Sequence, residues 1–280
     1  QEWSAVATGY SHTLAIKSDS TLCAWGFNGG GQLGDNTYDD KNSPVQIGTE
    51  ADWVKISAGD GHSVAIKTDG TLWAWGCNYY GQLGDGTTDG KHSPVKIGTD
   101  TDWTDAASNG SHTIAIKSDG TLWAWGYNYY GLLGDGTTDD KNSPVQIGSD
   151  TDWAVVSSGY AHCLAIKTDG TLWAWGNNFY GELGDGTTDD KTSPVKIGTD
   201  TDWAAVTAGS ARSYAIKTGG TLWAWGCNSD GILGDGTTEH RYSPVQIGIG
   251  TDWTAVSSGY SHCVAVKTDG SLWAWGDNSD

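Results

Sequence analysis

A histidine recurs at one position of a repeating pattern along the chain. Its occurrences are His12, His62, His112, His162 and His262. Imidazole changes its charge near neutral pH and is the commonest metal ligand, so a set of equivalent histidines could bind a metal or transfer protons. However, Arg212 takes this place once. If the repeating units are arranged around a common axis, their equivalent side chains point away from one another and do not converge on one site. We therefore interpret the histidine series as structural.

Stretches rich in Asp and Thr also recur, and their oxygen atoms could bind calcium, which takes about six to eight oxygen ligands. Their spacing is not that of a helix-loop-helix calcium site. Asp and Thr also close turns through hydrogen bonds from side chain to backbone, without any metal. We favour this second role and expect no cofactor. The weaker calcium candidates are Asp135, Asp139, Asp185 and Asp189.

Catalysis has no recognisable motif in this chain. The sequence contains neither G-x-S-x-G nor H-E-x-x-H, and no set of Ser, His and Asp is specific to one copy of the pattern. We therefore expect a protein that is not an enzyme.

The elements that position these residues repeat with a period of 50 residues. Five copies are complete and the sixth has 30 residues. A repeat of this length indicates a solenoid, a propeller or an array, in which each unit buries its apolar face against its neighbours. We predict a single domain over residues 1–280, with repeats at 1–50, 51–100, 101–150, 151–200, 201–250 and 251–280.

One unit contains four predicted strands, which in the fourth copy span residues 152–159, 162–168, 171–176 and 193–198. Asp169-Gly170 predicts a two-residue hairpin turn of the type that demands positive φ. Pro194 suits an edge strand, because proline has no N–H for a central ladder. Four antiparallel strands per unit indicate an all-β fold, a β-propeller, with small residues at the axis and the paired tryptophans outside. A stacked array or β-helix is the alternative.

Composition limits the partners. With 42 Gly, 17 Trp and 18% charged residues, the chain is typical of short strands and tight turns around an aromatic core. The net charge of −19 opposes contact with nucleic acid phosphates. No run approaches the roughly 20 apolar residues of a membrane helix, so no membrane insertion is expected. We expect five free, mostly buried thiols, because cysteines at equivalent positions two or more blades apart cannot reach the separation that a disulfide needs. We expect an extracellular or cell-surface bacterial protein, and the free thiols also suit the cytoplasm.

Three motifs resemble the repeats of the regulator of chromosome condensation family. They are G-Y-S-H-T-L-A-I-K-S-D at residues 9–19, L-W-A-W-G-x-N at residues 72–78 and G-Q-L-G-D-G at residues 81–86. The resemblance covers essentially the whole chain and implies a propeller, most often seven-bladed. It also implies that the recurring histidine begins the second strand and bonds to the backbone of the long loop. Family members include exchange factors for small GTPases, a plant UV-B photoreceptor, β-lactamase inhibitor proteins and bacterial surface proteins.

The repeat number departs from the family pattern. We predict six blades, the last lacking its outermost strand, with an open fragment of a seven-bladed propeller as the alternative. The missing strand would leave an exposed edge where a partner strand could dock. The exchange-factor and photoreceptor functions are disfavoured, because the units carry no insertions and the only arginines are Arg212 and Arg241.

Variation between copies is concentrated after the first and third strands, in loops that share one face of an antiparallel blade. The predicted partner-binding residues in these loops are Tyr79, Tyr80, Tyr129, Tyr130, Phe179 and Tyr180, with Tyr10, Tyr160 and Tyr260. Our first hypothesis is a binding or scaffold propeller that engages a protein or a glycan through this face. The alternatives are self-assembly through the incomplete last blade and, distantly, an enzyme that uses the propeller channel.

Overall fold

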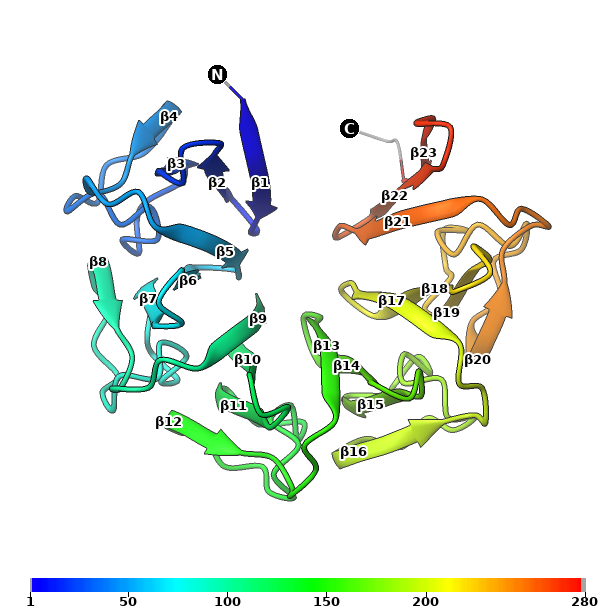
Figure 1. Cartoon of the computed structure of the whole chain (residues 1–280). Coiled ribbons are helices and arrows are strands. Elements are labelled where there is room, and N and C mark those ends of the chain that lie inside the picture. Colours follow the sequence, from blue (N-terminus) through cyan, green and yellow to red (C-terminus); the bar gives the residue numbers. More distant parts are fainter. Residues whose placement is uncertain (1, 278–280) are drawn as a thin grey trace. The chain divides into compact units, whose positions relative to one another are not determined.

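The computed structural model describes residues 2–277, and every regular element in this part of the chain is a β-strand. The strands form six antiparallel sheets, five of four strands and one of three (Figure 1). Strand order within each sheet follows the sequence. The fold is thus an all-β, six-bladed propeller whose last blade has three strands, which confirms the predicted fold class. The last three residues of the sixth repeat lie outside the described part.

The blades belong to two compact units, one of residues 1–129 with 139–151 and the other of residues 130–138 with 152–280. The strands of the first unit are β1 (Trp3–Thr8), β2 (His12–Lys17), β3 (Leu22–Gly26), β4 (Lys41–Gln46), β5 (Trp53–Ala58), β6 (His62–Lys67), β7 (Leu72–Gly76), β8 (Lys91–Lys96), β9 (Trp103–Asn109), β10 (His112–Lys117), β11 (Leu122–Gly126) and β12 (Lys141–Gln146).

The second unit contains the strands of blades four to six. They are β13 (Trp153–Ser158), β14 (His162–Lys167), β15 (Leu172–Gly176), β16 (Lys191–Ile197), β17 (Trp203–Ala208), β18 (Arg212–Lys217), β19 (Leu222–Gly226), β20 (Arg241–Gln246), β21 (Trp253–Ser258), β22 (His262–Lys267) and β23 (Leu272–Gly276).

The hairpin between β14 and β15 differs from the predicted two-residue turn. The Gly170 N–H donates to the Lys167 carbonyl, and the Lys167 N–H donates to the Thr171 carbonyl. Only Gly170 has a positive φ, of 75°. The turn therefore has three residues, and Asp169 contributes its side chain instead: Oδ1 accepts hydrogen bonds from the backbone N–H and the hydroxyl of Thr171. This is the local bonding by which Asp favours turns.

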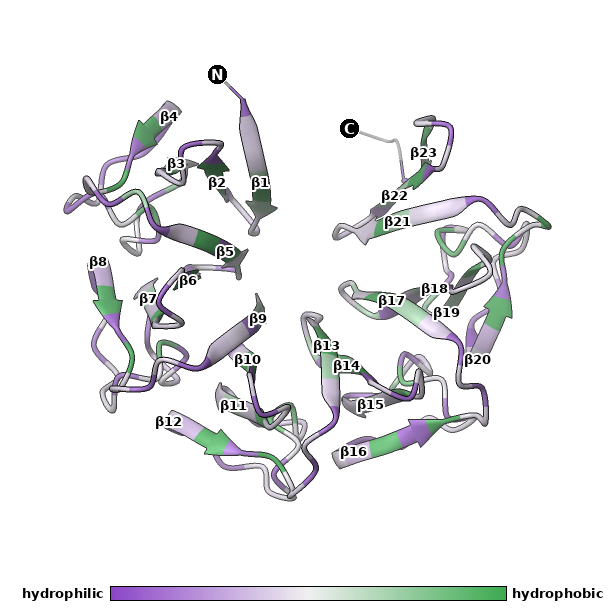
Figure 2. Ribbon diagram, in the orientation of Figure 1, coloured by the Kyte–Doolittle hydropathy of each residue, from purple (hydrophilic) through white to green (hydrophobic). Residues whose placement is uncertain are grey.

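The fourth strand of each complete blade is the edge strand, as its proline predicts. In blade four it begins at Lys191, two residues before the expected start, because Lys191 pairs with Gly176 across a bulge. Figure 2 shows a short apolar stretch in each of these strands. Its valine is partly buried and the following isoleucine is buried, so the outer strand covers the third strand of its own blade.

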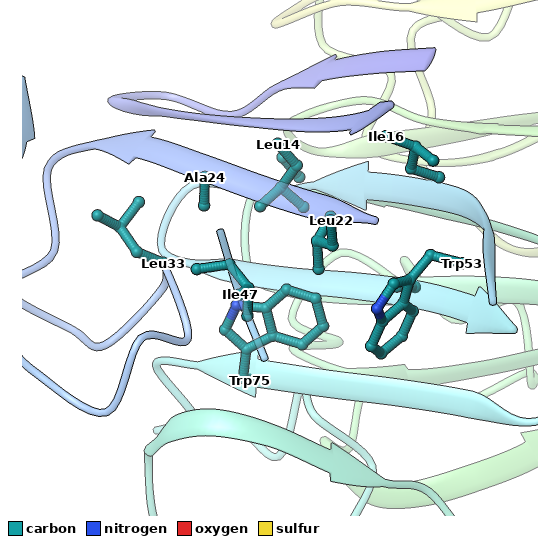
Figure 3. Close-up of a cluster of buried hydrophobic side chains, with 10 residues drawn as sticks. Leu14, Ile16, Leu22, Ala24, Leu33, Ile47, Trp53 and Trp75 are labelled. Atoms are coloured by element: carbon teal, nitrogen blue, oxygen red, sulfur yellow. The ribbon is translucent and has the colours of Figure 1, made fainter. Parts of the chain in front are cut away.

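The core lies between neighbouring sheets, and the tryptophans fill it. In the first unit, Trp53 and Trp75 of blade two pack with Leu14 and Leu22 of blade one and with Ile47 of the link between these blades (Figure 3). The second tryptophan of each W-A-W in blades two to five is completely buried. One such side chain removes roughly 150–250 Å² from water. Core packing is therefore the role of these rings.

Candidate functional site

The two variable loops of each blade lie side by side on one end of the sheet. The residue after the third strand donates its N–H to a carbonyl in the loop after the first strand, as in Cys77 to Gly61, Tyr127 to Ser111 and Asn177 to Ala161. The N···O distances are 2.8, 3.0 and 2.8 Å. The regular antiparallel ladder therefore brings the variable residues of one blade onto one surface, which we call the loop face.

In the first unit the loop face carries a cluster of four tyrosines, Tyr79, Tyr80, Tyr127 and Tyr129. The rings of Tyr80 and Tyr127 are 4.8 Å apart, and Tyr127 stacks on Tyr129 with centroids 6.4 Å apart. Tyr79, Tyr80 and Tyr129 are 78%, 42% and 65% exposed. Three of the four were predicted from the sequence. Tyr127 was not among the predicted residues, although it stands where blades one and two have Phe27 and Cys77.

A hollow of about 300 Å³ adjoins Tyr79 and Tyr80. Its other lining residues are Thr88, Asp140, Lys141, Asn142 and Ser143. They come from the long loop of blade two and from the beginning of the outer strand of blade three, and the Asn142 amide donates to the Gly86 carbonyl to join the two. The hollow thus offers aromatic surface beside a carboxylate, an ammonium group and hydroxyls, a combination that can hold a polar chain with an apolar side group.

The second unit has a smaller aromatic group. Phe179 is exposed and meets Tyr180 edge to face at 4.8 Å, and Tyr180 packs against His240 at 5.2 Å. Tyr130 belongs to this unit and is half-buried. The remaining candidates, Tyr10, Tyr160 and Tyr260, are exposed in the loops after the first strands.

The recurring histidines of blades one and two bond to the next blade, which corrects the expected direct bond to the loop backbone. Nε2 of His12 lies 2.9 Å from the Ser63 hydroxyl, and that hydroxyl donates to the Gln32 carbonyl at 2.7 Å. His62 makes the same link through Thr113 to Gln82. Because the hydroxyl hydrogen goes to the loop carbonyl, the imidazole must donate from Nε2. The loop is therefore reached through a hydroxyl of the following blade.

These imidazoles are neutral and enclosed. Burial lowers the pKa of His12 and His112 to about 4 and that of His62 to about 3, since the charged form loses its hydration. In blade one, the His12 ring lies so close to Gly9 that a Cβ at this residue would be 2.5 Å from the ring. There is therefore no space for a side chain at residue 9. Such a ring cannot exchange protons with a ligand near neutral pH, and the structural interpretation of the series holds for these three.

Blade five replaces the histidine arrangement with another one. Arg212 donates to the Tyr260 carbonyl at 2.9 Å. The Tyr214 hydroxyl donates to the Ile232 carbonyl, the position that corresponds to Gln32. Cys263 stands where blade two has Ser63, and its thiol is not the donor to this carbonyl. In blade five the loop carbonyl of Ile232 therefore accepts its hydrogen bond from Tyr214 of the same blade and not from a hydroxyl of the next blade.

The acidic loops use their carboxylates internally. Asp185 Oδ1 accepts from Asn178, from the Thr187 N–H and from the Thr187 hydroxyl, while Oδ2 lies 3.3 Å from Lys191. Asp135 accepts from Thr137 in the same way, and the backbone carbonyls of Asp139 and Asp189 accept from Asn128 and Asn178. Among the described residues no group of three or more His, Cys, Asp or Glu could hold a metal ion. These bonds favour the turn-closing role.

The lysine of each second strand is also occupied in blades two to six. In blade two, Lys67 Nζ lies 4.6 Å and 4.7 Å from the ring centroids of Trp53 and Trp73 and 3.3 Å from Asp52. Cation–π contacts of this kind contribute about 0.5–2 kcal/mol each. The same arrangement recurs at Lys117, Lys167, Lys217 and Lys267. These ammonium groups therefore stabilise blades and form no cationic surface.

The sequence predicted free thiols and no membrane-spanning helix. All five cysteines are free, and three of them are buried. Within residues 2–277 there is no helix of the length and apolar character needed to cross a bilayer.

Comparison with known proteins agrees with this geometry. A family model described as RCC1-like domain matches residues 1–206, and models of the regulator of chromosome condensation (RCC1) repeat match residues 219–266, 203–232 and 253–280. No curated protein sequence matches the chain.

Several solved structures share the fold. Human WBSCR16 has 23% identity and a TM-score of 0.88, covering 99% of this chain and 77% of its own. Yeast RCC1 (Prp20), in its complex with Kap60, has 23% identity and a TM-score of 0.87 over 98% of this chain and 70% of its own. Prp20p from Saccharomyces cerevisiae has 25% identity and a TM-score of 0.84, over 97% and 71%. Because the RCC1-like domain model alone matches more than half of the sequence, this chain belongs to the RCC1-like domain family.

Proposed function

We propose that this chain is a non-enzymatic, protein-binding propeller that engages its partner through the loop face. The observation that carries the proposal is the exposed tyrosine cluster. Tyr79 and Tyr80 occupy positions that hold Gly29 and Gly30 in blade one and Ser229 and Asp230 in blade five. Because those blades form the same sheet without aromatic residues, folding does not require the tyrosines, and their exposure has a cost in water that binding a partner removes.

Aromatic residues at the centre of a patch, flanked by polar groups, are the usual source of binding energy in protein interfaces. In the hollow beside Tyr79 and Tyr80, the flanking polar groups are those of Asp140, Lys141 and Asn142. The net charge of −19 favours a basic partner through long-range attraction. The structure of Prp20p is described together with its binding to Gsp1p and histones, and yeast RCC1 was solved bound to Kap60. These neighbours support a protein as the ligand class, and a glycan is the alternative ligand of the same face.

The test compares the wild-type chain with a triple variant, Tyr79→Ser, Tyr80→Ser and Tyr129→Ser. Proteins retained by the immobilised wild-type chain are purified, and their affinity for both chains is measured by calorimetry. We expect the variant to bind about 100-fold or more weakly, since each hot-spot residue contributes about 2 kcal/mol or more. Its melting temperature should change little, because exposed substitutions usually alter stability by no more than about 0.5 kcal/mol.

Tyr242→Ser is the matched control, because Tyr242 is also exposed but belongs to the second compact unit, whereas the tyrosine cluster belongs to the first. It should bind as the wild type does. Equal affinity of the triple variant and the wild type would exclude the tyrosine cluster as the binding surface. A large fall in melting temperature would show that the tyrosines support the fold instead. Binding to a glycan array with no protein ligand would select the alternative.

A further inference from the structure

The hollow beside the tyrosine cluster has walls that hydrogen bonds and ring packing hold in place. The Tyr80 N–H donates to the Gln82 side chain at 3.0 Å, and the Tyr80 ring packs on Tyr127 with centroids 4.8 Å apart. Asn142, which also lines the hollow, donates from its side chain to the Gly86 carbonyl at 3.1 Å, and its own carbonyl accepts the Gly86 N–H at 2.8 Å. A ligand that enters the hollow therefore does not have to order these two segments.

Asp140 gives the hollow a negative charge that is open to a ligand. Its side chain is exposed, and Oδ1 accepts the Asn128 N–H at 2.8 Å. Within residues 2–277, Oδ2 of this carboxylate has no hydrogen bond or ion pair. The next residue, Lys141, stands where blade two has Lys91, whose Nζ lies 3.1 Å from Asp85 of its own long loop. A lysine at this position is thus neutralised by its own blade and leaves the charge of Asp140 uncompensated.

The aromatic pair and the carboxylate are absent together from the junction between blades one and two. That junction has glycine at all three positions, with Gly29, Gly30 and Gly90 in place of Tyr79, Tyr80 and Asp140. The long loop of blade one still bonds to the outer strand of blade two, from the Asn36 N–H to the His92 carbonyl at 2.9 Å. Packing of successive blades therefore needs neither the rings nor the carboxylate, which favours a role for them in binding.

We propose that this hollow binds an arginine side chain of the partner protein. The inference rests on the proposed function and deepens it by naming the group that the loop face recognises. A guanidinium group stacks on aromatic rings and donates paired hydrogen bonds to a carboxylate. The hollow offers both, and the hydroxyls of Thr88 and Ser143 are further acceptors for its five N–H groups.

The size of the hollow and the charge of the chain also fit an arginine. Ligand pockets run from about 300 to 1,000 Å³, and the hollow, at about 300 Å³, suits a single side chain. The net charge of −19 attracts a basic segment towards the protein. Arginine is also among the residue types that supply most of the binding energy at protein interfaces.

The probe is the tripeptide acetyl-Gly-Arg-Gly-amide, titrated into the isotopically labelled 280-residue chain and followed by backbone amide NMR. We expect saturable shifts at residues 79, 80 and 140–143, with a dissociation constant on the order of 1 mM. The matched peptide with citrulline in place of arginine has nearly the same shape and no charge. It should bind about tenfold or more weakly, because it loses the cation–π attraction and the ion pair.

Two chain variants locate the site. Asp40 is the matched control for Asp140, because its Oδ1 accepts the Asn28 N–H at 2.7 Å in the same way and it is not among the residues that line the hollow. Asp140→Asn and Asp40→Asn both keep an oxygen for this N–H, and both remove one negative charge. Asp140→Asn should weaken binding of the arginine peptide about threefold or more, whereas Asp40→Asn should bind it as the wild type does. If Asp140→Asn does not fold, the two peptides still decide the question with the wild-type chain.

Equal binding of the two peptides, equal affinities of the two Asn variants, shifts confined to other parts of the chain, or no binding would each overturn the proposal. A partner protein that binds the triple tyrosine variant weakly but Asp140→Asn normally would keep the loop face as the binding surface and exclude the arginine. Conversely, the arginine peptide could bind the hollow while the partner binds the triple variant as tightly as the wild type. That result would overturn the proposed function and leave the hollow as an arginine site.

Discussion

Glu182 places an ionisable carboxyl group at a buried position that holds glutamine in blades one and two. At the equivalent positions, Gln32 and Gln82 accept the N–H two residues earlier through their side-chain carbonyl, at 2.9 and 3.0 Å. Glu182 accepts the Tyr180 N–H through Oε2 at 2.7 Å and is 1% exposed. Burial raises the pKa of this carboxyl to about 7, because the ionised form loses its hydration. Folding therefore favours its protonated form.

We predict that Glu182→Gln stabilises the protein above pH 7. The unfolded carboxyl titrates near 4.5 and the folded one near 7. Between these values the folded state binds more protons, so the stability of the wild type falls as pH rises. Glutamine keeps the hydrogen bond and does not titrate, and the gain should reach about 1–3 kcal/mol at pH 8.

Urea unfolding at pH 4 and pH 8 measures the effect. The two proteins should be nearly equal at pH 4 and differ at pH 8. A difference that is the same at both pH values would contradict the assigned pKa. Gln82→Glu is the reverse substitution at the equivalent position of blade two, and it should destabilise the protein with the same pH dependence.

At the residue scale the sequence separated positions free to vary from positions needed by the blade, and this located most of the tyrosine cluster. It did not find Tyr127, because this position holds Phe, Cys, Asn or Asp in the other copies, and only the structure shows that the ring packs on Tyr80 and Tyr129. Nor did it find the coupled change of Arg212, Tyr214 and Cys263. Arg212 and Tyr214 lie two residues apart, but Cys263 belongs to the next repeat, and only the structure shows that Tyr214 donates to the loop carbonyl of its own blade.

Among the elements, the turn between the second and third strands varies in an informative way. In five blades an Asp side chain accepts from the residue two positions later, and the third strand begins from that anchored residue. Blade five has Gly219 in this place. A Cβ at Gly219 meets no atom within 4 Å, and its φ is not positive.

We predict that Gly219→Asp stabilises the protein by about 0.5–1.5 kcal/mol. The new carboxylate can accept from the N–H and hydroxyl of Thr221, and the unfolded chain loses the freedom of a glycine. Gly220→Ala is the adjacent control and should destabilise, because φ there is 74° and a Cβ would lie 2.2 Å from the Thr251 carbonyl. Thermal unfolding of both variants gives the answer, and effects of the same sign would contradict this account of the turn.

The elements themselves were largely predictable. A 50-residue period with four strand patterns per copy indicated the strands, their order and the edge position of the proline strand. The turn type was wrong because Asp-Gly suits both a two-residue turn and a turn with glycine in the third position, and the hydrogen bonds decide between them. The start of the fourth strand was displaced because a bulge at Gly176 lets Lys191 pair, and a bulge leaves no periodic signal.

Over the whole molecule, the repeat places the same hydrogen bond between more than one pair of successive blades. The links from His12 to Ser63 and from His62 to Thr113 each join two successive blades of the first unit. In both, the imidazole donates from Nε2 because the hydroxyl itself donates to a loop carbonyl, and a second proton would sit on Nδ1, which is buried without a hydrogen-bond partner among the described residues. The sequence could not show these links, because the partner of each histidine belongs to the next repeat. Protonation of these histidines therefore bears on how blades are held together.

We predict that stability falls steeply as pH decreases from 6.5 towards 4. The folded pKa values of about 4, 3 and 4 for His12, His62 and His112 lie below the unfolded value of 6.5. In this range the unfolded state binds more protons, so each histidine lowers the free energy of unfolding by up to about 1.4 kcal/mol per pH unit. The variant His62→Gln lacks one titrating group. Its free energy of unfolding should therefore decrease with falling pH less steeply than that of the wild type, by up to about 1.4 kcal/mol per pH unit. This difference in slope does not depend on the stability of the variant at pH 7. Urea unfolding between pH 7 and pH 4.5 measures both slopes. Equal slopes would show that His62 is not the neutral, buried group described, whereas a reduced slope would show that His62 takes up its proton when the protein unfolds.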